Sequence, residues 1–369
     1  MPLNRRDFLF AALASPALAA QKKKKQAATS ERSNVLLMVA DDLGGYMLGC
    51  FGNQDIRTPA IDRLAQTGVR FSYSFASAPA ATEGGAAPVG GTPVSPAQAA
   101  DALTSAAKPF FITVTLGSPL AQSIPQKNLD LYTTAGFEAT GFEPAAANAT
   151  HKDMLRDARV NLRKYAGGVT TLDDQVGALM ADLQKHGLWE NTVTVFTSGH
   201  GFLAGHHGLW GDGLASDPVN MYEEVMRVPM IWTWPGHFPP GSVRPDVVSA
   251  DDVLATLGEI TGAPQASRSC GRSYMPFIYN QHMPKKQPWR GLAFSRFRNV
   301  QMARDDRYKL VLREGGPNEL YDEATDPAEK VNQYDNPQFV SVRDRFTSEL
   351  KGWRGPCAGT LIDLKTAPG

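Results

Sequence analysis

The feature that most constrains this chain is an uninterrupted, largely apolar run from Asn34 to Ala40 that ends in two aspartates. A strand of this composition has no face suited to water, and such strands are typical of parallel sheets that helices cover on both sides. Further strands are predicted at 110–116, 192–197 and 228–234. The pattern therefore predicts an α/β fold around a mostly parallel sheet.

Helical segments separate these strands. Thr58-Pro59 opens one that runs to Gly68 and carries apolar side chains on one face. Other helices are predicted at 95–107, 249–261 and 153–187, the last with an interruption near Gly167-Gly168.

The pattern changes after residue 271. Short strands are predicted at 291–296, 299–304 and 308–312, and a helix at 337–353. We therefore expect an α/β core at 33–265, with a shortened middle region, and a small C-terminal α+β subdomain at 266–369.

Composition narrows the possible functions. The 369 residues are 42% hydrophobic, which is enough for a packed core, and their formal net charge is zero. A neutral chain gives no reason to expect nucleic acid or an anionic membrane as a partner. The three cysteines are too few and too scattered to indicate a disulfide framework or a zinc motif, and one disulfide of unassigned pairing stays open.

The first twenty residues are typical of an export signal. Arg5-Arg6 precedes an apolar run from Phe8 to Ala19 that is too short to span a bilayer. Paired arginines before Phe-Leu resemble a bacterial twin-arginine signal, and an ordinary export signal is the alternative. We expect a signal at 1–20, a basic and polar spacer at 21–32, no membrane span, and a periplasmic or extracellular location.

Several short motifs follow one another along the chain. They are Asn34-Val-Leu-Leu-Met-Val-Ala-Asp-Asp-Leu-Gly44, Gly49-Cys-Phe-Gly-Asn53, Thr58-Pro-Ala-Ile-Asp-Arg-Leu-Ala65, Gly68-Val-Arg-Phe71, Lys108-Pro-Phe-Phe111, Leu172-Asp173, Gly187-Leu188, Asn191-Thr192 through Gly201, Tyr222-Glu-Glu224, Arg227-Val-Pro229, Tyr308-Lys309, Glu319-Leu-Tyr-Asp322 and Asp326-Pro-Ala-Glu329. In this order and at these intervals, the set resembles the sulfatase family over most of residues 33–353.

The resemblance implies an alkaline-phosphatase-like sandwich, with a mostly parallel central sheet and a small C-terminal antiparallel sheet plus a helix. It implies an arylsulfatase-type sulfuric ester hydrolase that acts on a sulfate-ester small molecule or a sulfated glycan. The family's cation is usually calcium, and its nucleophile is a formylglycine made from the cysteine of a Cys-x-Pro-Ser-Arg segment.

Three residues match the family's metal ligands. Asp41 and Asp42 correspond to two metal-binding carboxylates, although a turn or cap after the strand is the simpler alternative. His200 stands in Ser198-Gly199-His200-Gly201, where the family has an aspartate at the position of Gly199. The remaining set of two carboxylates and one imidazole is poor for calcium, so we expect calcium binding to be weak or lost.

The nucleophile segment is absent from the sequence. Continuation from Ser77-Ala78-Pro79 puts Ala81-Thr82-Glu83-Gly84-Gly85 where Cys-x-Pro-Ser-Arg belongs, and an alternative alignment uses 93–98. Thr82 and Ser95 are conceivable nucleophiles, but each is more simply a loop hydroxyl. Residues 76–94 consist mainly of small residues and predict a loop.

Other family residues are missing as well. Ser118-Pro119-Leu120 stands where a Pro-His pair is common, and Gly211 or Asp212 stands where a lysine is expected. Asp212 would put a negative charge where an anionic substrate needs a positive one. We expect structural roles for His206-His207, because adjacent residues seldom face one ion, and a helix cap for Asp251-Asp252.

Three hypotheses follow from these observations. The first is an active arylsulfatase with a non-standard site. The second is a non-catalytic sulfatase homologue, and the third is a metal-dependent phosphoesterase-like hydrolase that uses Thr82 or Ser95. Since function must be argued from the site, the chemistry favours the second. With much of the family's middle region missing, we also expect exposed surface near residues 76–107 and 117–150.

Overall fold

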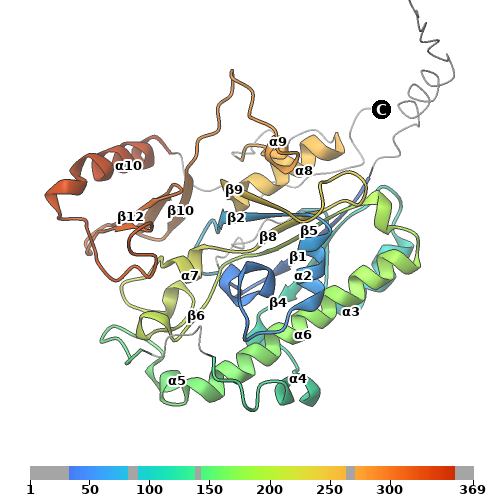
Figure 1. The fold of residues 1–369 in the computed structure, drawn as a ribbon, viewed down its shortest axis with the longest axis horizontal. Helices are drawn as coiled ribbons and strands as arrows, with labels where there is room; N and C mark the ends of the chain where they lie inside the picture. Colours follow the sequence, from blue (N-terminus) through green and yellow to red (C-terminus); the bar gives the residue numbers. More distant parts are fainter. Residues whose placement is uncertain (1–32, 82–89, 138–142, 263–270, 354–369) are drawn as a thin grey trace, which may run out of the picture. The chain divides into compact units, whose positions relative to one another are not determined.

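A computed structural model describes residues 33–81, 90–137, 143–262 and 271–353. Its largest element is a seven-stranded sheet in the order β3-β4-β1-β5-β8-β2-β9 (Figure 1). The strands are β1 (Asn34–Ala40), β2 (Val69–Phe75), β3 (Thr92–Val94), β4 (Phe111–Gly117), β5 (Thr192–Ser198), β8 (Met230–Thr233) and β9 (Ser242–Ser249). All pairs are parallel except those of β8, which runs antiparallel to β5 and β2.

Helices cover both faces of this sheet, as its apolar strands require (Figure 1). One face packs against α2 (Pro59–Gln66), α3 (Pro96–Ser105) and α6 (Ala158–Lys185), and the other against α8 (Val253–Thr261) and α9 (Met275–Ile278). Two short helices, α4 (Gln126–Asp130) and α5 (Lys152–Arg156), flank α6. The predicted mostly parallel α/β core is confirmed.

The long helix corrects one detail of the sequence analysis. It is continuous through Gly167 and Gly168, and the break lies instead at Asp157, between α5 and α6. The glycines serve close packing: a Cβ on Gly168 would lie 2.1 Å from the carbonyl oxygen of Pro119. They therefore let the chain after β4 approach the helix backbone, which is a second use of glycine besides breaking a helix.

The C-terminal part forms the predicted small antiparallel sheet with a helix. Its strands, in the order β10-β11-β12-β13, are Ala293–Phe297, Val300–Arg304, Tyr308–Arg313 and Glu319–Asp322. Helix α10 (Val340–Gly352) packs on this sheet through Phe346 and Leu350. One hydrophobic cluster contains Phe75 and Val247 of the large sheet together with Val300 and Met302 of the small one, so the two sheets share a core.

Between β5 and β8 the chain forms small elements: a hairpin of β6 (Leu203–Ala204) and β7 (Trp210–Gly211), a 3-10 helix η6 (Gly213–Ala215), and α7 (Glu223–Met226). The predicted exposed region at 76–107 is only partly found. Ala76, Ala78 and Ala80 are buried, whereas residues 92–98 are mostly exposed.

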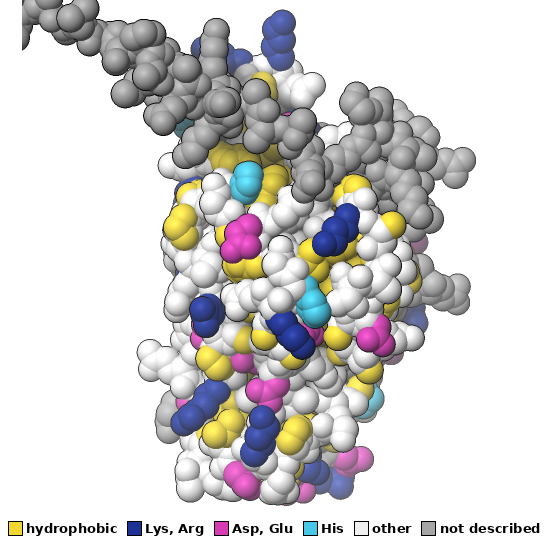
Figure 2. Space-filling view, turned by 90° about the vertical axis from the view of Figure 1, so that its right-hand side faces the viewer, with side chains coloured by type: hydrophobic (Ala, Val, Ile, Leu, Met, Phe, Trp, Pro, Cys, Tyr) yellow, Lys and Arg dark blue, Asp and Glu magenta, His cyan; other side chains and the backbone are white. Residues whose placement is uncertain are grey.

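The surface of the described residues carries charges of both signs (Figure 2). On the face shown in Figure 2, basic and acidic side chains are interspersed, and hydrophobic side chains show in small areas between them. Among the helices in the described ranges, none combines the length and the apolar character that crossing a membrane requires.

Candidate functional site

The candidate site lies where two neighbouring parallel strands end. Ala40 at the end of β1 pairs with Ser198 at the end of β5, so the residues that follow both strands leave the sheet at the same edge. The N–H of Gly199 donates to the Ala40 carbonyl (2.8 Å), and the N–H of Leu43 donates to the His200 carbonyl (3.0 Å). These bonds hold the two segments side by side.

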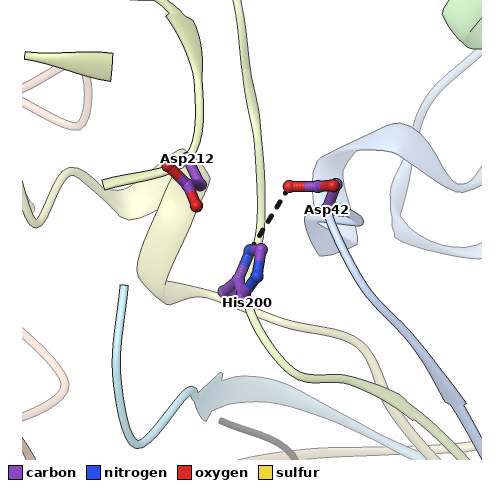
Figure 3. Close-up of side chains that lie close together, drawn as sticks. All are labelled: Asp42, His200 and Asp212. Atoms are coloured by element: carbon purple, nitrogen blue, oxygen red, sulfur yellow. Dashed lines mark ion pairs between the residues drawn. The ribbon is translucent and has the colours of Figure 1, made fainter. Parts of the chain in front are cut away.

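Asp42, His200 and Asp212 come together at this edge (Figure 3). Each offers one ligand atom, and these atoms all lie within 4.8 Å of one another. Nδ1 of His200 lies 3.5 Å from Oδ1 of Asp42, and the His200 side chain is 3% exposed. The structure therefore brings together two of the three predicted ligands and adds a third that the sequence analysis assigned to another role.

Asp41 does not join this group among the described residues. Its N–H donates to the Gly117 carbonyl at the end of β4 (3.0 Å), which continues the sheet by one residue. Asp42 follows with φ 52°, a left-handed conformation that aspartate tolerates better than most residues. The change of direction between the two aspartates separates their roles.

The neighbours of Asp212 are a feature that the sequence does not predict. The sequence analysis gives this residue as an adverse charge for an anionic substrate, and the structure places it beside Asp42 and His200, after β7 and at the start of η6. Its Oδ1 accepts the N–H of Leu214 (2.8 Å), which fixes the carboxylate. Its place in the sequence, at or beside the position where the family has a lysine, does not predict the contact with Asp42 and His200. That contact depends on how β6 and β7 fold back.

The electrostatics of the group would favour a bound cation. Burial raises the pKa of Asp42, while the nearby His200 imidazole and a hydrogen bond with the Ser118 hydroxyl act in the opposite direction. The carboxylates of Asp212 and Asp41 raise it further. A positive ion among these oxygens would relieve the repulsion.

The donor chemistry favours some cations over others. Calcium takes six to eight oxygen ligands, whereas this group offers two carboxylates and an imidazole nitrogen. A mixed set of nitrogen and oxygen donors suits borderline ions such as Mn²⁺ or Zn²⁺ better. The residues therefore fit a divalent cation, but they do not fit a calcium site well.

The chain segment that should carry the nucleophile passes close by. The N–H of Gly213, the neighbour of Asp212, donates to the Pro79 carbonyl (2.8 Å), and a Cβ on Gly213 would lie 2.5 Å from the Pro79 side chain. Ala81, which direct continuation of the alignment predicts at the position of the family's cysteine, is an exposed residue two positions farther on. Thr82, the first proposed substitute, lies outside the described residues.

Ser95 has a local structural role instead. It is the N-cap of α3 and forms a capping box with Gln98, whose Oε1 accepts from both the N–H (3.0 Å) and the hydroxyl (2.9 Å) of Ser95. It follows β3, which is separated from β1 by β4. This engagement does not favour Ser95 as a nucleophile.

A second group of acidic residues differs from the group of Asp42, His200 and Asp212, because basic side chains lie among its carboxylates. Glu223 on α7, Glu323 and Glu329 surround Lys309 and Arg304 of the small sheet. Glu329 pairs with Lys309, and its other oxygen accepts the Glu223 N–H (2.7 Å). We name these five residues the junction cluster, because they join α7 to β11, β12 and the chain after β13.

The remaining predicted structural residues lie near these elements. His207 stacks on Tyr222, with ring centroids 3.6 Å apart, and its Nε2 lies 3.4 Å from Oε2 of Glu224. Asp252 forms a capping box with Ser249 and an ion pair with Arg290 (2.6 Å). The predicted capping role at Asp251-Asp252 is therefore found at Asp252.

Comparisons with known proteins concern the family and the fold of the chain. A family model described as Sulfatase matches residues 96–263, and one described as N-sulphoglucosamine sulphohydrolase, C-terminal, matches residues 207–355. An ulvan-active sulfatase of Formosa agariphila is 22% identical over 88% of this chain and 80% of its own length. An N-acetylglucosamine-6-O-sulfatase of Bacteroides thetaiotaomicron is 27% identical over 52% of this chain, which spans only 35% of that relative.

Among solved structures, the phosphonate monoester hydrolase of Agrobacterium radiobacter matches with a TM-score of 0.71 at 19% identity. The match covers 87% of this chain and 95% of that one. Likeness at this identity concerns the fold, and it agrees with the predicted sandwich.

Proposed function

Because the chain belongs to the sulfatase family, we propose that it is a non-hydrolytic member that binds sulfate esters of carbohydrates with the help of a divalent cation. The family supplies the scaffold, and the site residues decide the chemistry. The chain would therefore bind the family's class of ligands without hydrolysing them.

The absent nucleophile segment carries the proposed loss of turnover. Where the alignment continues directly from Ser77-Ala78-Pro79, Ala81 takes the place of the family's cysteine, in a segment bonded through Pro79 to the neighbour of Asp212. A methyl group can neither attack sulfur nor hold a covalent intermediate. The two candidate substitutes do not supply a replacement within the described residues, since Ser95 caps α3 and Thr82 lies outside them.

Asp42, His200 and Asp212 would hold the cation, and it would supply the positive charge that a sulfate group needs. Asp212 then compensates for the aspartate that Gly199 replaces, because it returns one carboxylate to the group from a different chain segment. Relatives named as an ulvan-active sulfatase and an N-acetylglucosamine-6-O-sulfatase support a sulfated carbohydrate as the ligand class.

The proposed location is outside the cytoplasm. It rests on Arg5-Arg6 and the apolar run that follows, which lie outside the described residues. A fusion of residues 1–32 to a reporter that matures only after twin-arginine export tests this proposal, with Arg5→Lys/Arg6→Lys as the matched control.

Turnover of 4-nitrophenyl sulfate by the purified chain, with Mn²⁺, Zn²⁺ or Ca²⁺, is the decisive measurement. We expect no hydrolysis above that of the buffer with the same ion. Hydrolysis that Asp42→Asn abolishes would refute the non-hydrolytic proposal. Replacing Ala81 with cysteine serves as a second probe, since it restores a thiol at the family's position.

Binding is measured separately, by calorimetric titration of D-glucosamine 6-sulfate in Mn²⁺ and in EDTA. We expect saturable binding in Mn²⁺ but not in EDTA, and the Asp212→Asn variant should bind at least tenfold more weakly. Glu259→Gln, an exposed charge change on α8, is the matched control and should bind as the wild type does. Equal affinity in Mn²⁺ and EDTA would show that the cation has no part in binding.

A further inference from the structure

A pocket lies in chain segments next to Asp42, His200 and Asp212, the three residues that we name the cation group. It has a volume of about 260 Å³ and is lined by Tyr46, Phe51, His206, Glu223, Glu224, Arg227 and Pro327. Pro327 comes from the chain after β13, and the other lining residues come from the core. Neither the cation group nor the missing nucleophile accounts for it.

The pocket and the cation group share the same two chain segments. Leu43, next to Asp42, is bonded to His200, and the hydroxyl of Tyr46 donates to the Phe202 carbonyl (2.6 Å). Tyr46 is the fourth residue after Asp42, which limits the distance between their Cα atoms to roughly 14 Å even for an extended chain. A ligand of more than one sugar unit can therefore approach both places.

Two polar atoms of the pocket's residues lack hydrogen-bond partners. Oε2 of Glu223 and Nδ1 of His206 are buried, and neither has a hydrogen-bonding partner among the described residues. Oε2 of Glu224 faces Nε2 of His207 at 3.4 Å, and Oε1 of Glu223 lies 3.0 Å from Nε of Arg304. A buried acceptor without a donor is unfavourable, so a hydroxyl donor of a ligand is what the Glu223 carboxylate lacks.

The charges of the pocket are nearly balanced. Arg227 lines the pocket together with the two glutamates, and Arg304 and Lys309 also pair with Glu223. A strongly charged ligand, whether cation or anion, would therefore gain little here. A neutral ligand rich in hydroxyl groups gains most from carboxylates, which accept hydrogen bonds, and from a guanidinium, which donates them.

The apolar part of the lining suits the flat face of a sugar. Tyr46, Phe51 and Pro327 supply it, and the Phe51 ring is held by the Arg70 guanidinium at 4.9 Å from its centroid. Tyr46 packs edge-on against His206, with ring centroids 5.2 Å apart. Rings fixed in this way offer contact area at little loss of side-chain freedom.

We propose that this pocket binds one neutral pyranose ring. Its volume is just below the range of about 300–1000 Å³ that is usual for small-ligand sites, which limits the occupant to about one ring. The assignment extends the proposed function, because the ring would belong to the carbohydrate whose sulfate reaches the cation group. Binding by the pocket itself requires no cation, so the two can fail separately.

The test is a ligand-observed NMR titration in EDTA, with methyl β-D-glucopyranoside, methyl β-D-galactopyranoside and methyl N-acetyl-β-D-glucosaminide as probes. We expect saturable binding of at least one glycoside by the wild type. Phe51→Ala and Glu224→Gln should each weaken it at least tenfold. Phe277→Ala, which removes a half-buried ring elsewhere, and Asp212→Asn should leave it unchanged.

Each outcome is informative. The proposal is overturned if none of the three glycosides binds, or if both pocket variants bind them as strongly as the wild type does. It is also overturned if the pocket prefers ethanolamine, a small cation, to every glycoside. If Glu224→Gln does not fold, Phe51→Ala alone decides, since its side chain is only half buried. Sugar binding that survives Asp212→Asn while sulfate binding is lost separates this proposal from the proposed function.

Discussion

The cation group and the junction cluster are two answers to the same physical problem, the burial of carboxylates. The junction cluster places Lys309 and Arg304 among Glu223, Glu323 and Glu329, so nearly every negative charge has a built-in partner. The cation group has an imidazole and no comparable positive side chain among the groups that act on Asp42. The junction cluster is therefore suited to holding the elements together, whereas the cation group leaves room for an ion.

The pKa values in the junction cluster follow this balance. Burial lowers and its glutamate neighbours raise the pKa of Lys309, and the glutamates prevail. Burial and neighbouring carboxylates raise the pKa of Glu323 against the opposing charge of Lys309. The cluster has three carboxylates and two basic side chains, so it carries one carboxylate more than its cations can pair.

The largest effect should come from breaking the junction cluster. Lys309→Met leaves buried carboxylates without their central cation, and we expect the free energy of unfolding to fall by about 3–5 kcal/mol. Urea denaturation measures this loss. Lys330→Met removes the exposed partner of Glu143 and is the matched control, with an expected change below about 1 kcal/mol. Equal effects would remove the distinction between a cohesive cluster and a surface pair.

The next effect sharpens the other side of the comparison. A cation that binds only the folded chain should stabilise it, by about 2.7 kcal/mol when its concentration is a hundred times its Kd. We expect a rise in melting temperature with Mn²⁺ that Asp42→Asn and Asp212→Asn both abolish, and a smaller rise with Ca²⁺. Asp246→Asn, a carboxylate on β9 outside the group, should keep the full shift. A shift that survives all three substitutions would place the ion elsewhere.

Glu224 follows Glu223 of the junction cluster in the chain and pairs with His207. Its ionisation provides a test that depends on pH. The hydrogen bond from His207 and the charges of His207 and His206 outweigh burial and lower the pKa of Glu224 to about 2. Because the folded pKa lies below the unfolded value, its stabilisation is present above about pH 4.5 and is lost as pH falls toward 2.

We therefore expect Glu224→Gln to destabilise the chain at pH 7 by roughly 1–3 kcal/mol and to flatten the loss of stability between pH 4.5 and 2. Denaturation midpoints across this range measure both effects. Glu259→Gln on α8 is the control for a lost exposed carboxylate, and its profile should match that of the wild type. Parallel profiles for Glu224→Gln and the wild type would contradict the assigned pKa.

The parts of the fold that follow local rules were predictable, and the site was predictable only in part. The continuous apolar runs of β1 and β5 predict buried strands. Asp42 and His200 follow these runs closely, so the ends of both strands could be located from the sequence. Strand β9 was missed, because its alternating exposed half and its Pro245 hide the pattern until it pairs with β2.

The place of Asp212 beside Asp42 and His200 could not be predicted for a different reason. Its position one hairpin away from His200 says nothing about direction until β6 and β7 pair, and the close approach of Gly213 to Pro79 decides where it lies. The junction cluster combines residues from α7, β11, β12 and the chain after β13, which no local pattern joins. Contacts made at long range in the chain are the ones that the sequence could not supply.

The smallest expected effect concerns Ser95, which the sequence analysis kept as a possible nucleophile. As the N-cap of α3, its hydroxyl stabilises the first turn, and Ser95→Ala should lower the free energy of unfolding by about 1 kcal/mol. Ser95→Asp keeps an accepting oxygen at the cap and should restore most of that stability, whereas it cannot restore a serine nucleophile. If Ser95→Ala instead abolished hydrolysis of 4-nitrophenyl phosphate at unchanged stability, Ser95 would belong to a catalytic site at the edge of the sheet, and Ala81 would no longer argue against turnover.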